Sequence, residues 1–301
     1  MSRKIYSGLS QIPTGNASDK ITEGCLVLEG GAFRGLYTQG FLDCLMQNDI
    51  NFSCVIGVSA GALGGLNYVS GQIGRSARIN LGFRHDSRYV GAKALYKSHA
   101  ILDVGFLLED RGILEKFDED RFYRTKQRFI AVATNCLNGR STCFEKGKTK
   151  HIYEGVRASA TMPFISPMIK IGGIPFLDGG CSCKIPYRWA LKQGFKKIVV
   201  IKTREPEFRK EDKISKLAIE AYRKYPKFAT RLAYSSIHYN RQCDEIERLH
   251  ESGRIMRFAP TEKVTVSRVE RNVEKLGELY WLGWNNCNNQ LVVLRKYLEI
   301  S

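Results

Sequence analysis

Short apolar runs alternate with helically spaced apolar positions along the first quarter of the chain. Residues 25–28 and 53–56 are apolar runs followed by glycines, and both are predicted to be buried strands. Between them, apolar and small residues share one helical face: Leu36, Gly40, Phe41, Cys44 and Leu45. A helix of small residues is predicted from Ser59 to about Tyr68. This alternation predicts an α/β fold with a mainly parallel central sheet flanked by helices.

The same criteria extend this prediction to the rest of the chain. They predict strands at 129–134, 141–144 (its antiparallel neighbour), 174–177 and 197–201 (the last clear core strand), and helices at 151–159, 186–193 and 226–251. Residues 71–100 are predicted to be rich in loops. The helical spacing of Val269, Val273, Leu276 and Tyr280 predicts a helical C-terminus.

These patterns divide the chain into three expected segments. Residues 1–23 are polar and turn-rich, which is typical of a loosely attached lead-in segment. Residues 24–203 hold the predicted strands and form the expected catalytic domain. Residues 204–301 are expected to be a basic, mainly helical C-terminal region.

Charge narrows the choice of partners. The 301 residues carry 47 Lys and Arg against 30 Asp and Glu, a formal net charge of +17. Such a charge favours polyanions, either nucleic acid or the anionic surface of a membrane. No nucleic-acid motif is visible, so we expect peripheral contact with an anionic membrane through the basic residues of 71–100 and 202–231. An ordinary solvated basic surface is the alternative.

The cysteines and the apolar stretches bear on whether the protein binds a metal, is secreted or crosses a membrane. Nine scattered cysteines without a C-x-x-C pair favour reduced core thiols, and neither a metal site nor a cofactor is predicted. The N-terminus has no secretory apolar region, and no stretch approaches the ~18 apolar residues of a membrane span. We therefore expect a cytoplasmic protein that contacts the inner face of the membrane without crossing it. No signal for an oligomeric state is present.

The first segment that carries chemistry is Gly57-Val58-Ser59-Ala60-Gly61, between a predicted strand and a predicted helix. A G-x-S-x-G sequence in this context is typical of a nucleophilic serine on a sharp turn. Gly57 and Gly61 avoid side chains that would clash there. The alternative is a glycine-rich turn in which Ser59 caps the helix.

The second segment, Glu29-Gly30-Gly31-Ala32-Phe33-Arg34-Gly35, also lies between a strand and a helix. Its small residues leave backbone N–H groups accessible, as an oxyanion hole requires. A dinucleotide-binding fingerprint, G-x-G-x-x-G, fails because its third position, which must be glycine, holds Ala32. A plain tight turn is the remaining alternative.

The third segment is Asp178-Gly179-Gly180, at the end of a predicted strand, where catalytic residues of α/β sheets gather. A serine nucleophile needs a base, which is usually histidine. None of the five histidines lies in a glycine-rich loop at a strand end, and a buried carboxylate can serve instead. A Ser-His-Asp esterase that uses His238 or His250 is one alternative, and a non-enzymatic anion- or nucleic-acid-binding protein is another.

Taken together, these segments resemble the patatin-like phospholipase family, particularly compact members of bacterial type. EGGAFRG at 29–35, GVSAG at 57–61 and DGG at 178–180 follow the family's order, and residues 158–167 resemble its A-S-x-A-x-P block. The resemblance covers roughly residues 24–203 and implies a patatin-like three-layer fold. It departs from the family at Ala32, where a third glycine is usual, and at Glu29, where aspartate is usual.

The resemblance also implies a function. It implies a metal-free hydrolase of phospholipids or lysophospholipids, with Ser59 as nucleophile and Asp178 as base in a dyad without histidine. Amides of the loop Gly30, Gly31, Ala32 and Arg34 are expected to hold the oxyanion, with Arg34 supporting the loop. Gly35, Gly57, Gly61, Gly179 and Gly180 are expected to shape the motifs.

Overall fold

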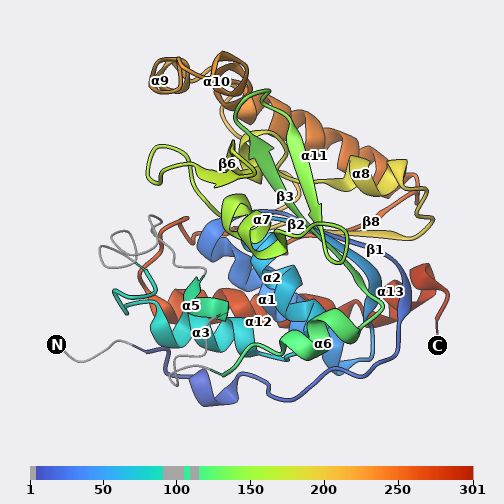
Figure 1. Cartoon of the computed structure of the whole chain (residues 1–301). Coiled ribbons are helices and arrows are strands. Elements are labelled where there is room, and N and C mark those ends of the chain that lie inside the picture. The colour runs from blue at the N-terminus through green and yellow to red at the C-terminus, as the bar shows by residue number, and fades with distance from the viewer. Residues whose placement is uncertain (1–4, 91–104, 109–114, 301) are drawn as a thin grey trace.

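The computed structural model describes residues 5–90, 105–108 and 115–300 (Figure 1). Its strands are β1 (Thr22–Leu28), β2 (Phe52–Val58), β3 (Arg128–Asn135), β4 (Ser141–Glu145), β5 (Ile169–Ile171), β6 (Ile174–Asp178), β7 (Ile198–Ile201) and β8 (Met256–Phe258). Its α-helices are α1 (Gly35–Gln47), α2 (Ala60–Val69), α3 (Arg75–Phe83), α5 (Gly105–Leu108), α6 (Glu119–Arg124), α7 (Ile152–Ser159), α8 (Tyr187–Lys192), α9 (Lys216–Ala221), α10 (Pro226–Ala233), α11 (Ser235–Glu251), α12 (Val273–Asn289) and α13 (Leu291–Leu298). Short 3-10 helices are η1 (Leu9–Gln11), η2 (Ala32–Arg34) and η3 (Gly179–Cys181).

The strands form one sheet in the order β5-β6-β3-β2-β1-β7-β8, with β4 paired to β3. Strands β3, β2, β1, β7 and β8 run parallel to their neighbours in this series, as predicted. Strands β4 and β6 pair antiparallel with β3, and β5 pairs antiparallel with β6. The predicted antiparallel neighbour at 141–144 is therefore confirmed.

Helices cover both faces of the sheet. In β1, Leu26 and Leu28 point to a core shared with α1, α2 and α12, while Cys25 and Val27 point to a second core under α8 and α11. This alternation within an almost fully buried strand is expected of a parallel sheet covered on both sides. Figure 1 shows α1, α2 and α12 on one side of the sheet and α8 and α11 on the other. The α/β fold with a flanked, mainly parallel sheet is confirmed.

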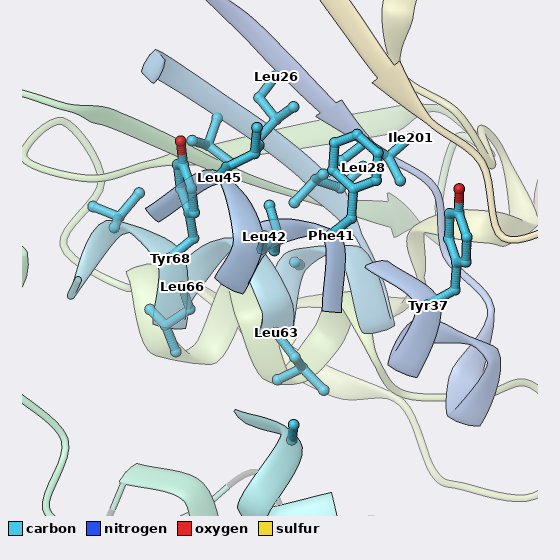
Figure 2. Close-up of a cluster of buried hydrophobic side chains, with 14 of the residues drawn as sticks. Leu26, Leu28, Tyr37, Phe41, Leu42, Leu45, Leu63, Leu66, Tyr68 and Ile201 are labelled. Atoms are coloured by element: carbon cyan, nitrogen blue, oxygen red, sulfur yellow. The ribbon is translucent and has the colours of Figure 1, made fainter. Parts of the chain in front are cut away.

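Helix α1 is buried almost along its whole length because it lies between the sheet and α12. Its residues Phe41 and Leu45 pack towards β1 in the cluster that Figure 2 shows. On its other side, a Cβ on Gly40 would lie 2.0 Å from the carbonyl oxygen of Tyr280 in α12. Gly40 therefore permits the close crossing of the two helices, and the C-terminal region forms part of this layer.

Several predicted boundaries differ from the structure. Residues 75–83 of the predicted loop form helix α3. The predicted helix 226–251 is two helices, α10 and α11, separated at Tyr234. They separate because the buried face of α10 packs on Cys136 and Leu177, whereas that of α11 packs on the sheet.

The C-terminal part of the chain also adds elements that the pattern missed. Residues 197–201 are not the last strand, because β8 pairs parallel with β7. Val269 precedes α12, whose start is set by Asn272, which accepts bonds from the amides of Glu274 and Lys275. The lead-in is not loosely attached, since Ile12 is buried in the main core. The division into three segments stays a prediction.

Two properties bear on the expected class of protein. The nine cysteines are all free thiols. Across residues 5–90, 105–108 and 115–300, no helix is long and apolar enough to cross a membrane.

Candidate active site

Ser59 lies at the tight turn between β2 and α2. Its backbone has φ 55° and ψ −121°, and a positive φ is uncommon for a residue with a side chain. A Cβ on Gly57 would lie 2.4 Å from the carbonyl oxygen of Gly61, and a Cβ on Gly61 would lie 2.6 Å from that of Leu28. Both positions therefore require glycine, which gives the G-x-S-x-G pattern a physical cause.

Asp178 lies within hydrogen-bonding distance of Ser59. The Ser59 hydroxyl donates to Asp178 Oδ2 at 2.7 Å, and the amide of Gly180 donates to Asp178 Oδ1 at 2.7 Å. Both Ser59 and Asp178 are 8% exposed. Burial raises the pKa of Asp178, while these two hydrogen bonds and the charges of Lys184 and Arg268 partly oppose the rise. The carboxyl group is thus a stronger base than an exposed aspartate.

The sheet register explains why residues so far apart in sequence meet. Ser59 follows Val58, which pairs with Val132 of β3, and Asp178 pairs with the next residue of β3, Ala133. Strand β6 runs antiparallel to β3, so Asp178 does not end a parallel strand as the strand-end argument supposed. Because β6 has only five residues, its last residue still lies near the edge where β2 ends.

The end of α7 and the residues that follow it bind the backbones of both Ser59 and Asp178. The hydroxyl of Ser159 accepts from the amide of Ser59 at 2.8 Å and donates to the carbonyl of Val132 at 2.6 Å. The amide of Asp178 donates to the carbonyl of Thr161 at 2.8 Å. The sequence block at 158–167 therefore connects the two residues of the predicted dyad, a role that sequence reasoning did not assign to it.

The glycine-rich loop after β1 packs directly against Ser59. A Cβ on Gly30 would lie 2.9 Å from the carbonyl oxygen of Val58 and 3.1 Å from Ser59 Cβ. Among the described residues, the amides of Gly31 and Ala32 have no hydrogen-bond acceptor. These amides are the kind of donor that can bind a negatively charged oxygen beside the serine.

Ala32 and Arg34 shape this loop. Ala32 has φ 51°, a left-handed value that glycine adopts at lower cost, so the departure from three glycines has a structural consequence. Arg34 Nε donates to the carbonyl of Gly31 at 3.3 Å. Burial and the charge of Arg204 lower the pKa of Arg34 to about 10.

The other predicted motif glycines also lie at crowded points. A Cβ on Gly35 would lie 2.9 Å from the Cβ of Ala60, one on Gly179 2.1 Å from the carbonyl oxygen of Val132, and one on Gly180 3.0 Å from Asp178 Oδ1. Every predicted site residue is therefore found in one region of the structure.

A cavity of about 530 Å³ opens beside Ser59 and Asp178. Apolar residues line one part of it: Met162, Pro163, Phe164, Ile165, Leu232 and Val269. Five cationic residues also line it: Arg34, Lys184, Arg204, Lys210 and Arg268. Apart from Arg34, sequence reasoning missed these cations, because they come from segments without a motif.

A second, narrower cavity of about 110 Å³ reaches Ser59 from the side of α3. Phe33, Leu63, Tyr89 and Val90 are among the residues that line it. Ser59 therefore faces two cavities, of which the smaller has mainly apolar walls.

The histidines of the described segments lie elsewhere. None of them lines either cavity at Ser59. His238 Nε2 is 3.5 Å from Arg231, and His250 Nδ1 is 3.4 Å from the amide of Arg257. His99 lies outside the described residues. In the same described ranges, no group of three or more His, Cys, Asp or Glu side chains could hold a metal ion.

Comparison with known proteins agrees with this geometry. A family model described as patatin-like phospholipase matches residues 26–191, which is more than half of the chain. The chain belongs to the patatin-like phospholipase family. A second model, described as a domain of unknown function (DUF6363), matches residues 225–299.

Two individual proteins illustrate the similarity. The uncharacterized protein YjjU of Escherichia coli K12 is 28% identical over 183 residues, which cover 59% of this chain and 51% of YjjU. The chain thus spans about half the length of this curated relative. The crystal structure of VipD from Legionella pneumophila aligns with a TM-score of 0.45 at 12% identity, covering 93% of this chain and 68% of VipD.

Proposed function

We propose that this patatin-like protein hydrolyses the acyl esters of phospholipids or lysophospholipids, with Ser59 as nucleophile and Asp178 as base. The observation that carries this proposal is the 2.7 Å hydrogen bond from the Ser59 hydroxyl to Asp178 Oδ2 at the wall of a cavity. A hydroxyl is activated when a base accepts its proton as it attacks.

Acylation uses both side chains and the glycine-rich loop. Asp178 takes the proton as Ser59 Oγ bonds to the ester carbonyl carbon, and the carbonyl oxygen becomes negatively charged. The amides of Gly31 and Ala32 are the proposed donors to this oxygen, because they belong to the loop beside Ser59 and have no acceptor among the described residues. Collapse of the intermediate breaks the ester C–O bond, and the proton on Asp178 passes to the alcohol that leaves.

Deacylation repeats the sequence with water. Asp178 accepts a proton from a water molecule as the water oxygen bonds to the acyl carbon. The intermediate collapses, Ser59 Oγ regains the proton from Asp178, and a fatty acid is released. The raised pKa of Asp178 supports this role, because a more basic carboxylate accepts a proton from a hydroxyl more readily.

Replacing Ser59 by alanine tests this proposal. Ser236 provides a matched control, because it is a serine that lines the same cavity without bonding to Asp178. We expect Ser59→Ala to lower kcat for a phospholipid or lysophospholipid ester by about 10⁴-fold or more. Ser236→Ala should stay within about threefold of the wild type. Wild-type turnover in Ser59→Ala would disprove the assignment.

Contact with an anionic membrane is the second part of the proposal. Beside the cavity, exposed apolar side chains gather on the loop before β5 and around α9: Phe164, Ile165, Ile214, Leu217 and Ile219. The rings of Phe164 and Tyr222 lie 5.4 Å apart, which brings this loop to the end of α9. Helices α9 and α10 project from the body of the molecule in Figure 1.

Exposed cations surround this apolar group: Lys213, Lys216, Arg223, Lys224 and Lys227. A surface with apolar and basic side chains is suited to anionic lipid, and each cation near such a surface contributes about 1 kcal/mol. Of the six basic residues of 71–100, Arg75 and Arg84 are buried, Arg78 and Arg88 form ion pairs with Glu115 and Asp86, and Lys93 and Lys97 lie outside the described residues. The proposal therefore uses the segment 202–231 alone.

Co-sedimentation with vesicles tests the contact. We expect binding to increase with the fraction of anionic lipid, and Lys216→Glu with Lys224→Glu to weaken it by about 10-fold or more. Lys192→Glu is the control, because Lys192 is exposed on α8 away from this surface. Binding that does not depend on anionic lipid would refute this part.

A further inference from the structure

The cationic part of the large cavity comes from four separate segments. Arg34 follows β1, Lys184 follows η3, Arg204 and Lys210 follow β7, and Arg268 precedes α12. Of the described residues, two acidic side chains line the same cavity, Glu29 and Asp178. We call Lys184, Arg204, Lys210 and Arg268, the four that lie outside the glycine-rich loop, the cationic wall.

The two acidic side chains of the cavity form no close ion pair with this wall. Among the described residues, no carboxylate forms an ion pair within 4.0 Å with any of its four cations. Glu29 Oε2 instead accepts from the amide of Thr203 at 2.6 Å, and Asp178 is engaged by Ser59 and Gly180.

Burial and the proximity of these cations lower the pKa of two lysines in the wall. Burial, followed by the charges of Lys184 and Arg268, lowers the pKa of Lys210 to about 6. Burial and the charge of Arg268 lower the pKa of Lys184. Like charges held together without a counter-ion are unfavourable unless an anion joins them.

One hydrogen-bond donor in the wall has no acceptor in the described part of the chain, and an anion with several oxygens could supply one. Arg204 Nε is buried and has no hydrogen-bond partner among the described residues, although Arg204 Nη1 donates to the carbonyl of Val264. A buried donor without an acceptor is unfavourable. A phosphate group supplies several acceptor oxygens and up to two negative charges, so it would satisfy this donor and reduce the repulsion.

The wall and Ser59 face the same cavity of about 530 Å³, so one substrate molecule can place an anionic group at the wall and its acyl ester at Ser59. We propose that the cationic wall binds the phosphate of the substrate and selects acyl lipids that carry a phosphate monoester close to the scissile ester. This inference rests on the proposed function and specifies its substrate class. A dianionic monoester neutralises more of the wall than a zwitterionic phosphodiester or an uncharged glyceride.

The binding of the head group is tested without catalysis. Glycerol 3-phosphate and glycerol are titrated calorimetrically into the Ser59→Ala protein at pH 7, in buffers of different ionisation enthalpy. We expect only the phosphate to bind, with uptake of protons, because an adjacent dianion raises the pKa of Lys210 from about 6. Lys210→Met should weaken binding by about 10-fold or more and reduce the uptake.

Two further variants distinguish a loss of phosphate binding from a loss of folding. Arg268 is exposed, so Arg268→Gln should fold normally and still weaken phosphate binding. Lys213→Met is the matched control, since Lys213 carries the same charge on the same segment but is exposed outside the cavity. Equal binding of glycerol, or equal weakening by Lys213→Met and Lys210→Met, would overturn the subsite.

Hydrolysis then distinguishes a lipid phosphate from a free phosphate ion. The ratio of kcat/KM for a 1-acylglycerol 3-phosphate to that for the same 1-acylglycerol should exceed 1 and fall about 10-fold in Lys210→Met and in Arg268→Gln. A ratio that these variants leave unchanged would show that the bound anion is not part of the substrate, and would overturn the inference. If phosphate binds but neither lipid is hydrolysed, the site stands and the proposed function fails.

Discussion

Two buried aspartates in this protein have similar hydrogen bonds and very different surroundings. Asp43 accepts from the amide of Gly74 at 2.8 Å and from the hydroxyl of Tyr280 at 2.9 Å, while Asp178 accepts from an amide and from the hydroxyl of Ser59. The exposed fractions of the two residues are 4% and 8%. Burial raises the pKa of both carboxyl groups, that of Asp43 to about 7.

The surroundings of Asp43 differ from those of Asp178, the proposed base. Asp43 lies on α1 and connects this helix to α12 and to the start of α3, within the packed layer below the sheet. Asp178 lines the cavity, and its hydroxyl partner belongs to a serine on a strained turn. Burial and a raised pKa are therefore common to both, and access to a cavity and a nucleophilic partner distinguish Asp178.

The largest expected effect separates the two aspartates by activity. Asp178→Asn should lower kcat by about 10²- to 10⁴-fold with little change in folding, because asparagine cannot accept the serine proton. Asp43→Asn should keep nearly wild-type kcat per folded molecule. Steady-state hydrolysis, corrected for the folded fraction by circular dichroism, measures both. Similar losses in the two variants would remove the distinction.

The free energy of unfolding should fall more in Asp43→Asn than in Asp178→Asn, the opposite of the order for kcat. Asp43→Asn should lower the free energy of unfolding at pH 5 by about 1–3 kcal/mol, since the asparagine amide carries two hydrogens where the protonated carboxyl group carries one, and the extra buried hydrogen has no acceptor. Between pH 4 and 7 the native state keeps a proton on Asp43 that the unfolded chain has released, so wild-type stability falls as pH rises. Urea unfolding should therefore show a smaller difference in the free energy of unfolding between wild type and Asp43→Asn at pH 8 than at pH 5. A constant difference would mean that Asp43 does not titrate in this range.

A smaller effect concerns what sets the basicity of Asp178. Lys184 Nζ donates to the carbonyl of Gly180 at 2.5 Å, and its charge lowers the pKa of Asp178. Lys184→Met should therefore move the acid limb of the pH profile of kcat/KM to higher pH, by about one unit. Lys192→Met on the exposed face of α8 is the control. A uniform loss of activity at every pH would instead indicate a purely structural role for Lys184.

The smallest effect concerns Ala32. Glycine relieves the positive φ of 51° but increases the entropy of the unfolded chain, so Ala32→Gly should change stability by less than about 1 kcal/mol. Activity should stay within about threefold, because glycine keeps the backbone amide that is the proposed donor to the oxyanion. Urea unfolding and kcat/KM measure the two quantities. A large loss of activity would show that the methyl group itself positions the loop.

The sequence predicted the part of the fold that depends on local pattern. The buried runs that became β1, β2, β3 and β7 were recognisable because their residues are apolar on both faces. The site residues Ser59 and Asp178 were recognisable because close contacts at the turns admit only glycine around them.

Other features depend on contacts between distant segments and left no local signal. The three residues of β8 become a strand only because β7 offers a free edge. The break at Tyr234 arises because α10 and α11 pack on different clusters. Lys184, Lys210 and Arg268 reach the cavity from segments without a motif, so a sequence pattern could not place them together.

Reaction with a fluorophosphonate probe, followed by mass-spectrometric mapping of the modified residue, tests the central claim without assuming a substrate. If Ser59 is the nucleophile and Asp178 its base, one adduct forms, on Ser59. It disappears in Ser59→Ala and forms more slowly in Asp178→Asn. An adduct on a different serine, or undiminished labelling of Ser59→Ala, would contradict this assignment.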